Sequence, residues 1–96
     1  MGTDFTDLVA WQEAARLAAE VLVAARRIRG LAGYSAASQM VRAAESIPAN
    51  IAEGYGRGLT ADGARLLRVA RASAAELESH LLVAGMGGRL PQAEVD

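Results

Sequence analysis

The sequence predicts an all-α protein, and three observations support this fold class. No stretch alternates apolar and polar residues as a β-strand would, and Val and Ile together contribute only ten of the 96 residues. Ala, Arg, Leu and Glu, which favour helices, are abundant throughout. Glycines gather within 30–33, 54–58 and 85–88, where they separate three long helical stretches. A chain of this length forms one domain, which we place at 1–96.

The first helix is predicted at about 7–29, with Thr6 as its N-cap and with Gly30 and Gly33 marking its end. Apolar positions cover about half of its circumference. One stripe with spacings of three and four consists of Leu8, Trp11, Ala15, Ala18, Leu22 and Ala25. A helix on a simple two-layer core needs an apolar arc of only about 100°. We therefore expect this helix to contact several neighbours, one of them on another chain.

The second helix is predicted at about 35–54, with Ser35 as its N-cap. A polar stripe runs beside its apolar face and consists of Gln39, Arg42, Ser46, Asn50 and Glu53. Pro48 lies in the middle, and because proline lacks an N–H and strains the turn before it, we expect a kink or a break there. The stripe has two interpretations. Its members either satisfy one another and register subunits, or contact a ligand or RNA.

The third helix is predicted at about 60–84, with Thr60 as its N-cap. Pro91 suits the first turn of a fourth helix, which would begin near 91. The core is expected to be carried by Trp11, Ile47, Ile51, Leu77 and Leu81. Of the apolar residues, which are 52% of the chain, 22 are Ala, so this core is thin and self-association would supply the missing burial.

Arginines outnumber acids between residues 39 and 73, where five stand against three acidic residues. The five are Arg42, Arg57, Arg65, Arg68 and Arg71. In a ring this excess would repeat and could bind a phosphate backbone, with Tyr55 stacking on an unpaired base. The alternative is a solvated face whose arginines pair with acids such as Glu76 and Glu78.

Composition excludes several other classes. The net charge of −1 gives no strong overall field for nucleic acid, and the absence of cysteine removes disulfides and thiolate zinc sites. The acidic amino terminus is unlike a secretory signal, and no apolar run is long enough to span a membrane, so we expect a cytoplasmic protein. His80 is the only histidine. We therefore predict no catalytic residue, no metal site, no cofactor and no enzymatic activity.

The segment Ser46-Ile47-Pro48-Ala49-Asn50-Ile51-Ala52-Glu53-Gly54, followed by Tyr55, Gly56 and Arg57, resembles the signature of a known family. Flanking residues extend the match: Phe5, Leu8, Trp11, Gln12, Gln39, Arg42, Ala43, Ala70, Ser73, Ala74, Glu76, Leu77 and Glu78. The family is that of the four-helix-bundle proteins first noticed as products of intervening sequences in bacterial large-subunit ribosomal RNA genes. The resemblance implies an antiparallel up-down four-helix bundle and a homo-oligomeric ring, with a pentamer favoured. It implies no established biochemical activity.

Two departures from the family bear on function. The best-understood relatives are accessory proteins of diversity-generating retroelements, which bind a reverse transcriptase and nucleic acid through a basic pentameric barrel, whereas this chain is slightly acidic. The fourth helix is truncated or missing after Pro91. The first hypothesis is a non-enzymatic ring that scaffolds or binds another macromolecule. The rival is an RNA-binding accessory protein, for example to a reverse transcriptase, and a third is a small antitoxin-like or regulatory module with a protein partner.

Overall fold

A computed structural model of the protein describes residues 4–28 and 30–88. These residues form a 3₁₀ turn at Phe5–Asp7 and three α-helices: α1 (Val9–Ala25), α2 (Leu31–Gly56) and α3 (Ala61–Met86). Within these two ranges there is no β-strand, so the predicted all-α class is confirmed. The fourth helix predicted near Pro91 lies outside the described residues.

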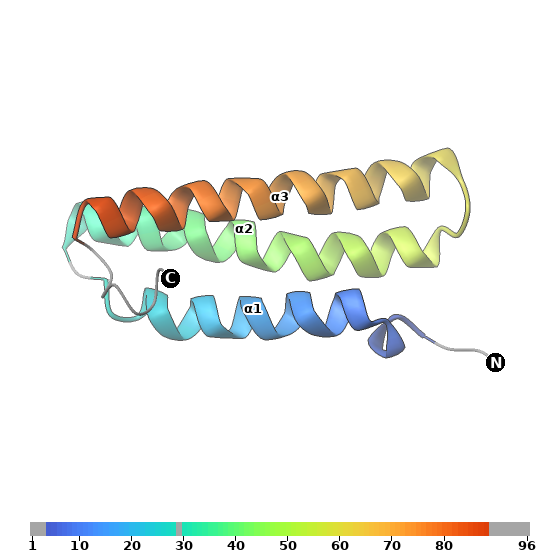
Figure 1. The fold of residues 1–96 in the computed structure, drawn as a ribbon, viewed down its shortest axis with the longest axis horizontal. Helices are drawn as coiled ribbons and strands as arrows, with labels where there is room; N and C mark the ends of the chain where they lie inside the picture. The colour runs from blue at the N-terminus through green and yellow to red at the C-terminus, as the bar shows by residue number, and fades with distance from the viewer. Residues whose placement is uncertain (1–3, 29, 89–96) are drawn as a thin grey trace.

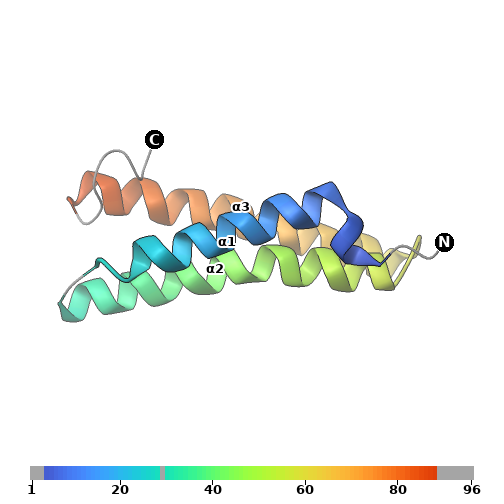
Figure 2. The ribbon, with the colours of Figure 1, turned by 90° about the horizontal axis from the view of Figure 1, so that it is seen from below.

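The three helices run up, down and up, so α1 and α3 point the same way and α2 runs against both (Figure 1). α2 packs against α1 and against α3, whereas α1 and α3 scarcely approach each other. A view at right angles shows α1 lying across the space between the other two helices rather than in one flat layer (Figure 2). One side of the α1–α3 pair is therefore left without a covering helix.

α1 is shorter than predicted at both ends. Thr6 is not its N-cap: its backbone N–H and its hydroxyl both donate to the side chain of Asp4, which caps the 3₁₀ turn instead. The hydrogen bond from the Thr6 hydroxyl lowers the pKa of the Asp4 carboxyl most, and the bond from the Thr6 backbone N–H lowers this pKa further. At the other end α1 stops at Ala25, and the chain reverses through Gly30, whose φ of +83° is readily reached only by glycine.

α2 begins earlier than predicted and does not break. It starts at Leu31, so the prediction of Ser35 as the N-cap is wrong, and Gly33 is a buried residue inside the helix rather than a terminator. The helix also continues past Pro48. Proline removes a single backbone hydrogen bond, and the buried side chains of Ala44 and Ile47 hold this turn against its neighbours. The predicted break is therefore wrong.

The core lies along α2 and is built mainly from small side chains. Met40 and Leu77 are its largest fully buried members. The other members of the buried cluster are Ala14, Ala18, Val21, Ala43, Ala44, Ile47, Ala70 and Ala84. Of the predicted core residues, Ile47 and Leu77 are buried, whereas Trp11, Ile51 and Leu81 are half-buried. Trp11 meets Phe5 edge to face, with ring centroids 5.3 Å apart, which fastens the 3₁₀ turn to α1.

Candidate functional site

The family-like segment occupies the second half of α2 and the turn into α3, where the two helices approach most closely. A Cβ placed on Gly63 would lie 2.5 Å from the carbonyl oxygen of Gly58 and 3.0 Å from that of Gly54. A Cβ on Gly54 would lie 3.1 Å from the oxygen of Gly63 and from the side chain of Leu67. Gly63 therefore requires glycine because backbone fills the space that a side chain would take, whereas a Cβ on Gly54 would only be tight.

A small polar cluster crosses the same helix pair nearer its middle. The hydroxyl oxygens of Ser46 on α2 and Ser73 on α3 are 2.8 Å apart, and Ser73 is 8% exposed. The side-chain amide of Asn50 donates to the carbonyl oxygen of Ser46 at 2.8 Å and to its hydroxyl at 3.0 Å. Each side chain satisfies another, and the cluster ties the two helices without an ionic group.

Only two members of the predicted polar stripe join this cluster. Ser46 and Asn50 are half-buried, whereas Gln39, Arg42 and Glu53 are exposed on α2. Ser73 lies between Ala70 and Leu77 on the buried side of α3, and it was not predicted to be the partner of Ser46. A serine within an otherwise apolar arc was the available signal, because a buried hydroxyl requires a hydrogen-bond partner.

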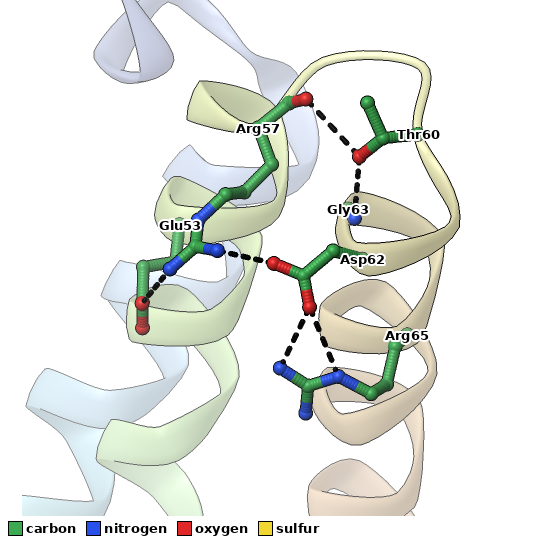
Figure 3. A network of polar contacts seen from close by, with 6 residues as sticks. All are labelled: Glu53, Arg57, Thr60, Asp62, Gly63 and Arg65. Carbon is green, nitrogen blue, oxygen red and sulfur yellow. Dashed lines mark hydrogen bonds and ion pairs between the residues drawn. The ribbon is translucent and has the colours of Figure 1, made fainter.

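A second polar network closes the turn between α2 and α3 (Figure 3). The hydroxyl of Thr60 accepts a hydrogen bond from the backbone N–H of Gly63 at 2.9 Å, which confirms Thr60 as the N-cap of α3. Asp62 forms ion pairs with Arg57 from the end of α2 and with Arg65 from its own helix, the latter at 3.0 Å. Asp62 thus joins the two helix ends across the turn.

The predicted arginine patch divides into two kinds of residue. Arg57 and Arg65 are held by Asp62, and Arg57 also lies 3.6 Å from Glu53, so their partners are these acids rather than Glu76 or Glu78. Arg68 and Arg71 are exposed on α3 and form no ion pair with another described residue. The side chain of Tyr55 is 39% exposed, beside Arg57.

The side of the bundle between α1 and α3 is apolar and open. A hollow of about 190 Å³ is lined by Leu17 of α1 and by Ala74, Leu77, Glu78, Leu81 and Leu82 of α3. Leu17 is 37% exposed and Leu82 is 52% exposed, while Leu67, one end of the same face of α3, is 48% exposed. Leu17 also lines a separate hollow on α1, together with Glu13, Ala14, Arg16 and Glu20. Leucines exposed in a row at one groove are typical of a surface that meets another polypeptide.

A larger hollow of about 460 Å³ lies between α1 and α2 near the turn that joins them. Apolar side chains, among them Leu22, Ile28 and Val41, line most of it. Arg26 and Arg42 add positive charge at its edge, so the arginine of the polar stripe that precedes Ser46 faces this hollow rather than the Ser46–Ser73 contact.

The described residues thus define a small all-α protein of three long helices. Residues 6–96 match the model of the 23S rRNA-intervening sequence protein family, and the chain belongs to this family. A comparison with curated proteins found no significant match. None of the helices in the described part of the chain is both long enough and apolar enough to cross a membrane.

Proposed function

We propose that this protein is a non-enzymatic, cytoplasmic subunit that assembles with copies of itself and scaffolds or binds another macromolecule. The observation that carries the proposal is the uncovered apolar side between α1 and α3. Leu17 and Leu82 lie there with a third to a half of their surface in water. The described residues offer no other helix to cover them.

The free energy of burial favours association. Apolar surface removed from water contributes about 25 cal/mol per Å², and the interior of this chain is composed largely of alanines that bury little area each. Leucines left outside a thin core are therefore the largest unused source of stabilisation. Packing of copies against one another would use it.

The finer architecture is part of the same proposal and is based on the resemblance to the family. We propose a four-helix bundle in which a fourth antiparallel helix has its place in the groove between α1 and α3, with α2 kinked at Pro48. We also propose a ring of five copies. The open groove supports the first point, since an up-down bundle seats its fourth helix between the first and the third.

Sedimentation of the purified chain at micromolar concentration tests the assembly. We expect a mass five times the 10.0 kDa of one chain for a single ring, or a multiple of that mass where rings associate. A stable monomer would remove the proposal, because the apolar groove would then be tolerated in water.

The second candidate function is nucleic-acid binding as an accessory protein, for example to a reverse transcriptase. The exposed Arg68 and Arg71, which have no ion pair among residues 4–28 and 30–88, favour it. Single-stranded RNA should then bind with an affinity that falls as salt rises, and changing Arg65, Arg68 and Arg71 to Ala should abolish binding. RNA binding that the three substitutions leave unchanged would exclude this arginine row as the site.

A further inference from the structure

The residues on the outward face of α3 are arranged symmetrically about a midpoint of the helix. It consists of Leu67, Arg71, Ala74, Ala75, Glu78 and Leu82. From the midpoint between the two alanines, Arg71 and Glu78 lie at equal distances along the helix, and Leu67 and Leu82 lie at equal distances further out. At 100° per residue these positions share one side of α3. The two halves therefore carry the same apolar residues at equivalent positions, and their charged residues are of opposite sign.

The described residues neither bury these side chains completely nor neutralise the charged ones. Leu67 is 48% exposed and Leu82 is 52% exposed. Arg71 and Glu78 are both exposed, and neither forms an ion pair with a residue in 4–28 or 30–88. Ala74 and Leu82 also line the open groove beside α1, so the face is continuous with the apolar hollow there.

We propose that a second copy of this chain packs its α3 antiparallel against this face, about a two-fold axis between Ala74 and Ala75. The inference rests on the proposed self-association and names its contact. A two-fold contact must be complementary to itself, and this face is: Arg71 of each copy meets Glu78 of the other, and each Leu67 meets a Leu82. The alanines at the axis let the backbones approach closely, which makes both pairs reachable.

The contact predicts even-numbered assemblies. A two-fold axis pairs chains and does not by itself close a ring of five. Combined with the proposed ring of five, the contact joins two rings back to back through α3, and the expected mass is then ten times that of one chain. This outcome differs from the single ring.

Charge reversal with mixing tests the pairing. Arg71→Glu and Glu78→Arg each place like charges together at two symmetry-related points, so for each variant alone we expect the dissociation constant of the α3 contact to rise about tenfold or more. An equimolar mixture of the two variants restores opposite charges at both points, and the double variant R71E/E78R does so within one chain. Both should recover the wild-type mass in sedimentation. Failure of both to recover would overturn the antiparallel pairing.

Cross-linking tests the same face without altering its charge. The chain has no cysteine, so Ala75→Cys introduces a single thiol next to the proposed axis. A short bis-maleimide should join two such chains efficiently, whereas the matched Val69→Cys, exposed on the far side of α3, should remain uncross-linked. A monomeric wild-type chain would overturn the proposed function and this contact together. If the chain assembles, but the charge reversals leave its mass unchanged and Ala75→Cys chains are not cross-linked, only the contact is overturned. Another segment or another protein would then fill the groove.

Discussion

The two sides of α3 differ in the size and the burial of their side chains. Toward α2, small residues bring the backbones together, with Gly54 and Gly63 in contact at one end and Ser46 bonded to Ser73 in the middle. Toward α1, larger side chains such as Leu82 stand half in water. A helix pair built on glycine, alanine and serine gains close contact and fixed register but buries little apolar area. The α2–α3 pair therefore gains its stability from close backbone contact, whereas the α1–α3 side keeps the apolar surface that the proposed assembly would bury.

The largest effect on the tight side is expected from Gly63→Ala. Its Cβ would lie 2.5 Å and 3.0 Å from two backbone oxygens, which cannot rotate away as a side chain could. The strain should outweigh the higher helix propensity of alanine and lower the free energy of unfolding by about 2 kcal/mol. Urea unfolding followed by circular dichroism measures it.

Gly56→Ala is the matched control for that measurement. Gly56 is the last residue of α2, and a Cβ placed on it would have no atom of a neighbouring element within 4 Å. Alanine should therefore raise the free energy of unfolding by about 0.5 kcal/mol through helix propensity alone. Equal destabilisation by the two substitutions would show that close backbone approach is not what requires Gly63.

Ser73→Ala removes the hydrogen bond between the hydroxyls of Ser46 on α2 and Ser73 on α3. The hydroxyl of Ser46 then keeps the amide of Asn50 but loses its partner across the interface. We expect a loss of about 1 to 1.5 kcal/mol in the free energy of unfolding, measured in the same way. A double-mutant cycle with Ser46→Ala should show coupling, and strictly additive losses would contradict the bond.

Thr60→Ala tests the start of α3. The hydroxyl of Thr60 accepts from the N–H of Gly63, and alanine leaves that donor to water. The expected loss is about 1 kcal/mol, and Thr60→Ser should retain nearly all of the stability since serine caps equally well. Comparable losses for serine and alanine would assign the effect to the methyl group instead.

Asp62→Asn should have a smaller effect, although the residue holds two arginines. The side chains of Arg57 and Arg65 are 52% and 57% exposed, so water and salt screen both ion pairs. We expect a loss below about 1 kcal/mol, reduced further in high salt. A large loss independent of salt would show that the network at the turn is structural rather than a surface feature.

On the open side, Leu82→Gln should leave the single chain almost unchanged. Half of this side chain is already in water, so the free energy of unfolding measured below the dissociation concentration should stay within about 0.5 kcal/mol of wild type. Self-association, measured by sedimentation, should weaken clearly. A stability loss like that of Gly63→Ala would remove the distinction between the two sides.

Periodicity predicted the three helices because each has a sustained apolar face, but it misjudged the glycines. Gly33 and Gly54 were assigned to turns, whereas Gly33 is buried within α2 and Gly54 lies inside the same helix against α3. A glycine signals either a turn or a close backbone contact, and only the neighbouring helix decides which. Pro48 was expected to interrupt the helix, but α2 continues through it because tertiary packing outweighs the loss of one hydrogen bond.

The candidate site was predictable only in part. Thr60 was recognised as a cap because its function is local in sequence. The partners of Arg57 and of Ser46 depend on how two helices lie in space, so Asp62 and Ser73 could not be assigned from spacing alone. The charge symmetry of α3 is present in the sequence, but it acquires meaning only once the structure shows that this face is exposed.

The direction of the three helices gives the molecule two unlike ends. The 3₁₀ turn at Phe5–Asp7 and the turn between α2 and α3 lie at one end, and the turn between α1 and α2 lies at the other (Figure 1). A ring of side-by-side copies would gather every α2–α3 turn on a single rim and so present one polar and one apolar-hollowed surface to a cargo. Chains related by a two-fold axis would instead display the same rim at both extremities, giving an object without a top or a bottom that could bridge two identical targets.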